Sequence, residues 1–145
     1  MSRIFRPMTK DDVVDVFKIE CELFPDPWPA KAFLSEIEQG NTSFPFIVEE
    51  NNEIIGYIVC WYYHTELHIG NIAVVASKQG KGIGRYLIDT IFEYFKDCKT
   101  AFLEVKETNN RAINLYKTYG FHIAYTRIRY YPNGDNALVM IKTIE

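Results

Sequence analysis

The chain has 145 residues, of which 48% are hydrophobic and 24% charged, and its formal net charge is −3. This composition is typical of a single globular domain, predicted here to span residues 1–145, and excludes disordered and fibrous classes. The weak negative charge argues against a broad nucleic-acid-binding face, and no apolar run is long enough to cross a bilayer. Because Met1-Ser2-Arg3 opens no hydrophobic signal region, we expect a cytoplasmic protein without membrane or nucleic-acid partners.

The first part of the chain predicts one strand and two helices. Ile4–Pro7 is a short strand, and the capping-box pattern Thr9–Asp12 starts a helix that ends at Pro25. Pro29 suits the first turn of a second helix, for which Gly40 is the C-terminal stop. The apolar residues of these helices recur at helical spacing: Val13, Val16, Phe17, Cys21 and Phe24 in the first, and Phe33, Leu34 and Ile37 in the second.

The middle of the chain predicts three strands, a long helix and a fourth strand. Phe44–Glu49 and Ile54–Tyr63 form a hairpin around two asparagines, and Leu67–Val74 is the next strand. An amphipathic helix starting at Ile83 runs to Lys96 and is followed by the apolar strand Thr100–Val105.

The last part predicts a short helix and a hairpin. Asn109 and its neighbours offer N-caps for a helix that Gly120 closes, and the hairpin strands are Phe121–Tyr131 and Ala137–Ile144. The resulting order, β-α-α-β-β-β-α-β-α-β-β, indicates an α/β fold in which helices pack on one mixed sheet.

A glycine-rich segment, Gln79–Arg85, lies between a predicted strand and the long helix. That arrangement places backbone N–H groups and a helix N-terminus around a phosphate. The dinucleotide and P-loop patterns both fail when counted from Gly80, because each requires a glycine where Arg85 stands. The spacing that fits is Q-x-x-G-x-G, from Gln79 through Gly82 to Gly84. A glycine-rich turn that only reverses the chain is the alternative.

This loop resembles the pyrophosphate-binding signature of the GNAT acetyltransferases, and the predicted element order is the one expected of the GNAT fold. Further segments resemble the RimI-like N-alpha-acetyltransferases, the ribosomal-protein-alanine acetyltransferases that modify a protein's N-terminal amine. These segments are Asn71–Val74, Leu103–Val105 with Asn109, Ala112–Tyr116 with Tyr119–Phe121, and Arg129–Pro132 with Asp135, Ala137 and Met140.

The resemblance implies acetyl-coenzyme A as co-substrate, no metal, and the N-terminal peptide of a protein, such as a ribosomal protein, as acceptor. Glu104 would be the general base and Tyr116 the general acid. The residues implied to contact acetyl-coenzyme A are Ile72, Ala73, Val74, Gln79, Gly80, Lys81, Gly82, Ile83, Gly84, Arg85 and Asn109. Those implied to wall the acceptor groove are Phe24, Trp28, Tyr130 and Tyr131, although Phe24 and Trp28 could instead join the two N-terminal helices.

One position departs from the family pattern. Gly80 stands where many relatives carry an arginine or lysine, which leaves Lys81 and Arg85 as the nearby cations. We therefore expect cofactor affinity to depend more on backbone N–H groups.

The chemistry of acetyl transfer supports the two catalytic assignments. An α-amino group has a pKa of roughly 7.7–8.0, so removing its proton at neutral pH costs only about 1 kcal/mol, within reach of a carboxylate base. Glu104 interrupts an apolar strand, where a salt bridge or a splayed strand end is the alternative role. The phenol of Tyr116 can donate to a departing thiolate, although core packing is the usual role of a helical tyrosine. The N–H of Val74 is a candidate to polarise the thioester carbonyl.

The histidines and the cysteines are not predicted to bind a metal or to act as nucleophiles. His64 and His68 do not match the H-E-x-x-H pattern, and histidines four apart on a strand lie too far apart for one metal ion. Cys60 and Cys98 lie in apolar runs typical of buried thiols, and with Cys21 they form no disulfide pattern. We therefore expect direct transfer in a ternary complex rather than an acyl-cysteine intermediate.

Two rival functions and the oligomeric state stay open at this point. One rival is acetylation of a small amine such as a polyamine, and the other is a non-catalytic coenzyme A-binding module. The Tyr130-Tyr131-Pro132 hairpin and the Pro27-Trp28 loop argue against the small-amine acceptor. The presence of both Glu104 and Tyr116 argues against the non-catalytic module. A monomer or weak homodimer is expected.

Overall fold

The computed structural model describes residues 3–144. Met1, Ser2 and Glu145, the first and last residues of the predicted domain 1–145, lie outside the described residues. The strands are β1 (Arg3–Pro7), β2 (Ser43–Glu50), β3 (Glu53–Tyr63), β4 (Glu66–Val74), β5 (Thr100–Lys106), β6 (His122–Arg127) and β7 (Ala137–Thr143). The helices are α1 (Val13–Leu23), α2 (Ala30–Glu38), α3 (Ile83–Tyr94) and α4 (Asn110–Thr118), with short 3-10 turns η1 (Lys10–Asp12) and η2 (Ala76–Lys78). This order confirms the predicted fold.

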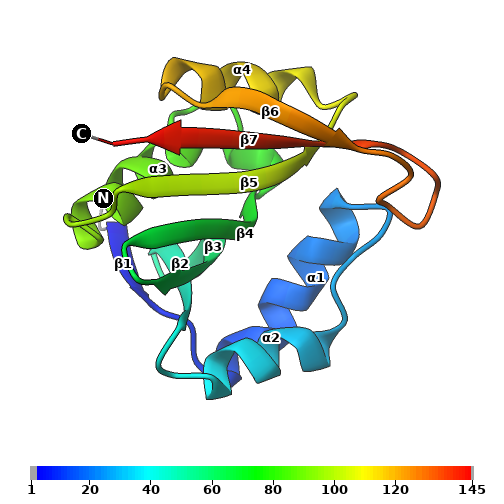
Figure 1. The fold of residues 1–145 in the computed structure, drawn as a ribbon. Helices are drawn as coiled ribbons and strands as arrows, with labels where there is room; N and C mark the ends of the chain where they lie inside the picture. Colours follow the sequence, from blue (N-terminus) through cyan, green and yellow to red (C-terminus); the bar gives the residue numbers. More distant parts are fainter. Residues whose placement is uncertain (1–2, 145) are drawn as a thin grey trace.

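The strands form one twisted sheet in the order β1-β2-β3-β4-β5-β7-β6 (Figure 1). Every neighbouring pair is antiparallel except β4 and β5, which are parallel and joined through α3. The parallel pair β4–β5 therefore lies in the middle of the sheet, with β1, β2 and β3 on one side and β7 and β6 on the other.

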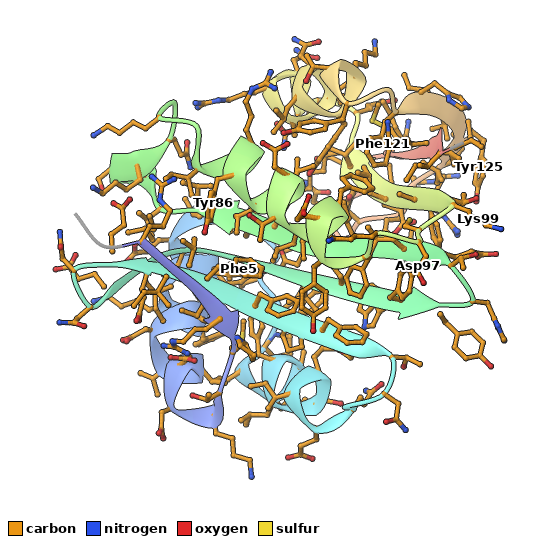
Figure 2. All side chains as sticks on the ribbon, turned by 90° about the vertical axis from the view of Figure 1, so that its left-hand side faces the viewer. Phe5, Tyr86, Asp97, Lys99, Phe121 and Tyr125 are labelled. Atoms are coloured by element: carbon orange, nitrogen blue, oxygen red, sulfur yellow. The ribbon has the colours of Figure 1, made fainter. Side chains whose placement is uncertain are left out.

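The helices cover both faces of the sheet. Helices α1 and α2 lie together on one face and α3 on the other, with the sheet between them (Figure 2). Each face has its own hydrophobic core: Val16, Phe33 and Tyr57 belong to the α1–α2 side. The larger core on the other side contains buried residues of α3 and α4. At the sheet's first edge, Phe5 of β1 and Tyr86 of α3 meet edge to face, with ring centroids 6.4 Å apart (Figure 2).

Local sequence signals explain where several elements begin. The predicted capping box is present, with the Thr9 side chain and the Asp12 side chain each bonded to the other's backbone. Asn51 and Asn52 both have positive φ, as a tight hairpin turn requires. The Asn109 side chain accepts a hydrogen bond of 3.2 Å from the N–H of Ala112 and so caps α4.

Helix α3 and strand β6 both end earlier than predicted. Helix α3 ends at Tyr94 rather than Lys96, and β6 ends at Arg127 rather than Tyr131. The strand stops because Arg129 takes a φ of +52° and donates its N–H to the Asn136 side chain at 2.9 Å instead of to a strand. Tyr130 and Tyr131 consequently belong to the β6–β7 connection.

No helix within residues 3–144 is both long enough and apolar enough to cross a membrane.

Candidate active site

The site forms where β4 and β5 separate. Their pairing covers only Glu66–Ile69 against Thr100–Leu103, after which β5 pairs with β7 alone. At the same point β4 contains a bulge, because Val59 and Cys60 of β3 face Asn71 and Ile69 and leave Gly70 without a partner. From Gly70 onward, one edge of β4 is therefore free of β5.

A first cavity of about 620 Å³ lies beside this free edge and the glycine-rich loop. Its lining comes from α1 and the residue after it, the end of β4, the loop, the start of α3, and α4. The lining residues are Leu23, Phe24, Ile72, Ala73, Val74, Lys78, Gln79, Gly80, Gly82, Ile83, Gly84, Arg85, Asn109, Arg111, Ala112, Asn114, Leu115, Tyr116 and Thr118.

Backbone N–H groups face this cavity from two directions. The N–H of Val75 donates to Ile55 on the β3 side, and alternate residues of a strand point opposite ways, so the N–H of Val74 points to the free edge. Gly82, with a φ of +87°, is the N-cap of α3, and the first intrahelical bond belongs to the N–H of Tyr86. The earlier N–H groups of α3 lack intrahelical partners and can bind an anion at the positive end of the helix dipole.

A second cavity of about 380 Å³ adjoins the first. Its lining comes from the end of α1, the α1–α2 connection, the middle of β4, the end of β5, α4 with its cap, and Tyr131 of the β6–β7 connection. The residues that line both cavities are Leu23, Phe24, Ile72, Asn109, Ala112 and Tyr116. The two spaces thus meet at Ile72 and Tyr116.

The two cavities carry opposite charge. The charged residues lining the first are Lys78, Arg85 and Arg111, with no carboxylate among the described residues. The second contains the carboxylates of Glu20, Asp26 and Glu104, with Lys106 as its one cation among residues 3–144. This suits an anionic ligand on one side and an ammonium group on the other.

Glu104 lies on β5 just beyond the last residue that pairs with β4. Its Oε1 is 2.9 Å from Nε2 of His68, and 14% of the Glu104 side chain is exposed. Both alternatives raised for this residue are therefore present, because the carboxylate lies at a splayed strand end and has a charged or polar partner. Neither prevents it from facing the second cavity, which it lines.

Tyr116 is buried at the junction of the two cavities. Burial, and secondarily the neighbouring Tyr131, raises the pKa of Tyr116 above its ordinary 10.0. Burial also raises the pKa of Tyr131 to about 12, with smaller effects from Tyr130 and Glu104. Both phenols therefore keep their protons at neutral pH and can act as hydrogen donors.

Glu20 is a site-lining residue that the sequence reasoning missed. Its side chain, on α1, is almost fully buried and accepts hydrogen bonds from Tyr57 Oη at 2.6 Å, Asn71 Nδ2 at 3.0 Å and the N–H of Trp28 at 3.0 Å. The carboxylate so joins α1, β3, the bulged part of β4 and the α1–α2 connection. The signal for it was its position on the apolar stripe of α1, where a charged residue needs buried partners.

Most of the residues assigned to the cofactor line the first cavity, but Lys81 does not. Of the four aromatic residues assigned to the acceptor, Phe24, Trp28 and Tyr131 line the second cavity, and Tyr130 lines neither cavity and is 48% exposed. Trp28 also packs against Phe33, with ring centroids 5.3 Å apart, so both of its proposed roles are compatible with its position. Arg111 and Lys78 were missed because each lies just before a matched segment, Lys78 before Gln79 and Arg111 before Ala112.

The cysteines and histidines, to which no chemical role was assigned, line neither cavity. Cys60 and Cys98 are buried free thiols, Cys21 is an exposed one, and burial raises the pKa of Cys60 and of Cys98. His64 lies in the β3–β4 turn and His68 on β4. No group of three or more potential metal ligands occurs within residues 3–144.

Comparison with known proteins gives the family. Residues 13–121 match the family model described as acetyltransferase (GNAT) family. The chain is 31% identical over 134 residues to the [ribosomal protein bS18]-alanine N-acetyltransferase of Escherichia coli (strain K12), covering 89% of each chain. The crystal structure of the ribosomal-protein-S18-alanine N-acetyltransferase from Escherichia coli superposes with a TM-score of 0.90 at 28% identity, covering 99% of this chain and 95% of that one.

A structure of the NatC complex bound to Gag peptide and CoA shares the fold, with a TM-score of 0.85, 22% identity and full coverage of both chains. The glycine-rich loop at the start of α3, the free edge of β4 and the matched residues together lead to one conclusion: this chain belongs to the GNAT family of acetyltransferases.

Proposed function

We propose that this protein transfers the acetyl group of acetyl-coenzyme A to the α-amino group of a protein N-terminus. The observation that carries the proposal is the pair of adjoining, oppositely charged cavities that meet at Tyr116. The first suits the phosphates of coenzyme A, and the second suits an ammonium acceptor. The two ligands would then approach each other where β4 and β5 separate.

The residues at the junction can perform the steps of direct transfer. Acetyl-coenzyme A supplies the acetyl group as an activated thioester. Glu104 accepts a proton from the acceptor's ammonium group, directly or through one water molecule. The N–H of Val74 donates a hydrogen bond to the thioester oxygen as negative charge develops there. As the carbon–sulfur bond breaks, Tyr116 gives its phenolic proton to the departing sulfur, and the second proton released by the amine nitrogen restores the phenol through solvent. A free thiol and an acetylated amine result.

An α-amino acceptor suits this site better than a lysine side chain. A lysine ammonium has a reference pKa near 10.4, so its deprotonation would require about 3 kcal/mol more from the site than an α-amine does. Of the three carboxylates that line the second cavity, Glu104 is the proposed base, and the aromatic residues Trp28 and Tyr131 line the same cavity. These features support an N-terminal residue as the group that enters.

Direct transfer is also favoured over an acyl-cysteine route. A nucleophilic cysteine needs a lowered pKa and access to the substrate. Burial raises the pKa of both Cys60 and Cys98, and neither lines the two cavities. A ternary complex therefore fits these residues best.

By its name, the Escherichia coli relative is an alanine N-acetyltransferase of ribosomal protein bS18. We extend this to the present chain as the proposed acceptor class, the N-terminus of a ribosomal protein. Such an acceptor would place the reaction in the cytoplasm.

The test compares three acceptors with acetyl-coenzyme A under one set of conditions. They are a peptide with a free N-terminal alanine, the same peptide with a blocked N-terminus and an internal lysine, and a polyamine. Mass spectrometry should locate one acetyl group on the N-terminal nitrogen of the first peptide, with much slower modification of the others. Faster turnover of the polyamine would identify a small-amine acetyltransferase, and no product from any acceptor would favour a coenzyme A-binding module.

A further inference from the structure

Arg111 lies against the glycine-rich loop although it comes from α4. A Cβ placed on Gly80 would lie 3.3 Å from Nη2 of Arg111, and Nη1 of Arg111 is 3.4 Å from Oε1 of Gln79. Gly80 has a φ of +77°, which a glycine adopts easily. The loop therefore has no side chain at this position, and a guanidinium group from another element lies beside it.

Of the other cations near the loop, Lys78 and Arg85 have side-chain partners and Lys81 lies outside the first cavity. Lys78 pairs with Glu50 at 3.5 Å. The guanidinium of Arg85 is 3.3 Å from Thr118 Oγ1 and lies over the Tyr119 ring at 5.7 Å. Lys81 does not line the first cavity. Lys81 and Arg85 were expected from the sequence to be the cations of the phosphate site, and a third cation is therefore a candidate beside them.

Arg111 is that candidate because its guanidinium lies beside Gly80 and, like that of Arg85, is not paired with a carboxylate among the described residues. Within residues 3–144 it has no carboxylate at ion-pair distance, and its one side-chain hydrogen bond is the long contact with Gln79. It lines the first cavity beside the unpaired N–H groups at the start of α3. A guanidinium fork can bind two phosphate oxygens at once, which complements the single N–H donors of a loop.

We infer that Arg111 binds the diphosphate of coenzyme A and supplies, from α4, the cation that the loop lacks at Gly80. This rests on the proposed function, since it assigns a residue to the cofactor site of that reaction. A cofactor held in this way would join the loop before α3 to the start of α4. Because α4 also carries Asn109 as its cap and Tyr116 at the cavity junction, phosphate binding would fix the helix that presents the general acid.

The experiment measures binding of three acetyl thioesters to wild type, Arg111→Gln and Arg111→Lys by titration calorimetry without any acceptor. The thioesters are acetyl-coenzyme A, its 3′-dephospho form, and acetylpantetheine, which has no phosphate. Lys117→Gln is the matched control, because it removes the same charge from the exposed face of the same helix and lines neither cavity.

For Arg111→Gln, we expect Kd to rise about tenfold for both phosphate-bearing thioesters, as for loss of one charge-assisted contact, and to stay unchanged for acetylpantetheine. Arg111→Lys should recover part of the loss, and Lys117→Gln should bind all three as wild type does. An effect confined to acetyl-coenzyme A would move Arg111 to the 3′-phosphate and overturn the diphosphate assignment. An equal loss with acetylpantetheine, or no loss at all, would overturn the inference.

A second variant tests the relationship between the two positions. Adding Gly80→Arg to Arg111→Gln returns a cation to the loop, and it should bind acetyl-coenzyme A more tightly than Arg111→Gln alone. Equal or weaker binding, with unchanged thermal stability, would contradict the idea that Arg111 replaces a side chain at Gly80. These binding measurements test the inference separately from the proposed function, because they involve no acceptor. If wild type acetylates peptides but the Arg111 variants bind acetyl-coenzyme A as wild type does, only the inference is wrong.

Discussion

Oε1 of Glu104 and Nε2 of His68 lie 2.9 Å apart, at the place where β4 and β5 cease to pair. Because an ionised carboxylate can only accept, the imidazole donates this hydrogen bond. His68 is itself fixed by aromatic neighbours, with the Phe102 ring stacked at 4.4 Å and the Trp61 ring at 4.8 Å. The hydrogen bond to His68 occupies one carboxylate oxygen of Glu104, and the other oxygen is free to accept a proton in the second cavity.

Replacing Glu104 by Gln should remove the base while keeping its shape. We expect kcat to fall about 10²- to 10⁴-fold at neutral pH, the range of general acid–base catalysis, with KM for acetyl-coenzyme A unchanged. The deficit should shrink in alkaline solution, because the acceptor amine then loses its proton without help. A pH profile of kcat for both proteins checks this, and a deficit of constant size at every pH would contradict the assignment.

Replacing His68 tests whether it positions the base. His68→Gln keeps an N–H donor, whereas His68→Leu has none, so we expect kcat to stay near wild type in the first and to fall about tenfold in the second through looser positioning of Glu104. Affinity for acetyl-coenzyme A should be the same in both variants, which separates this effect from a general loss of structure. If His68→Gln is as slow as His68→Leu, the imidazole does more than donate one hydrogen bond, and the positioning role is wrong.

The sequence predicted elements and motifs well because they are local. Apolar periodicity, caps and glycine spacing predicted the element order and the loop before α3, and Glu104 on β5 lines the second cavity, where its role as base stays a prediction. What it could not supply were contacts between distant elements. Arg111 meets Gly80 only because α4 packs beside the start of α3, and neighbours in sequence were taken as the cations instead. Tyr130 was placed in the acceptor groove with Tyr131, and its role there stays a prediction; the side chain is 48% exposed and lines neither cavity.

Glu20→Ala should destabilise the fold around the second cavity. It would leave three donors, on Tyr57, Asn71 and Trp28, without their acceptor, and each buried unsatisfied group is costly. We expect the free energy of unfolding to fall by about 2–4 kcal/mol. Glu22→Ala, which removes an exposed carboxylate from the same helix, should change it little. Urea unfolding of both variants makes the comparison.

The same variant should also affect the acceptor more than the cofactor. Glu20 bonds the N–H of Trp28, and both residues line the second cavity but not the first. In protein that remains folded, KM for the peptide should rise while Kd for acetyl-coenzyme A stays constant. A change confined to Kd for acetyl-coenzyme A would show that the network does not shape the acceptor side.

Acid should weaken the junction between β1 and α1 through Asp12. Both carboxylate oxygens of Asp12 accept from Arg6, at 2.8 and 2.9 Å, and a hydrogen bond from the N–H of Thr9 adds to them. The bond to Arg6, ahead of the smaller effect of Thr9, lowers the pKa of Asp12 below its ordinary 3.8, against the opposing effect of burial. A carboxyl whose pKa is lower in the folded state stabilises the protein fully above the unfolded pKa, and this contribution is lost as the pH falls through the folded pKa.

Asp12→Asn should therefore lower the free energy of unfolding by about 1–2 kcal/mol at neutral pH, the range for a lost cap and charge-assisted bond. The difference from wild type should begin to shrink as the pH falls below the ordinary carboxyl pKa, and it should disappear only below the lower pKa of folded Asp12, where the wild-type side chain is protonated as well. Asp11→Asn is the control, since Asp11 is its exposed neighbour and should show no such pH-dependent difference. A gap between wild type and Asp12→Asn that stayed the same in strong acid would mean that the Asn side chain disturbs the turn for a reason other than charge.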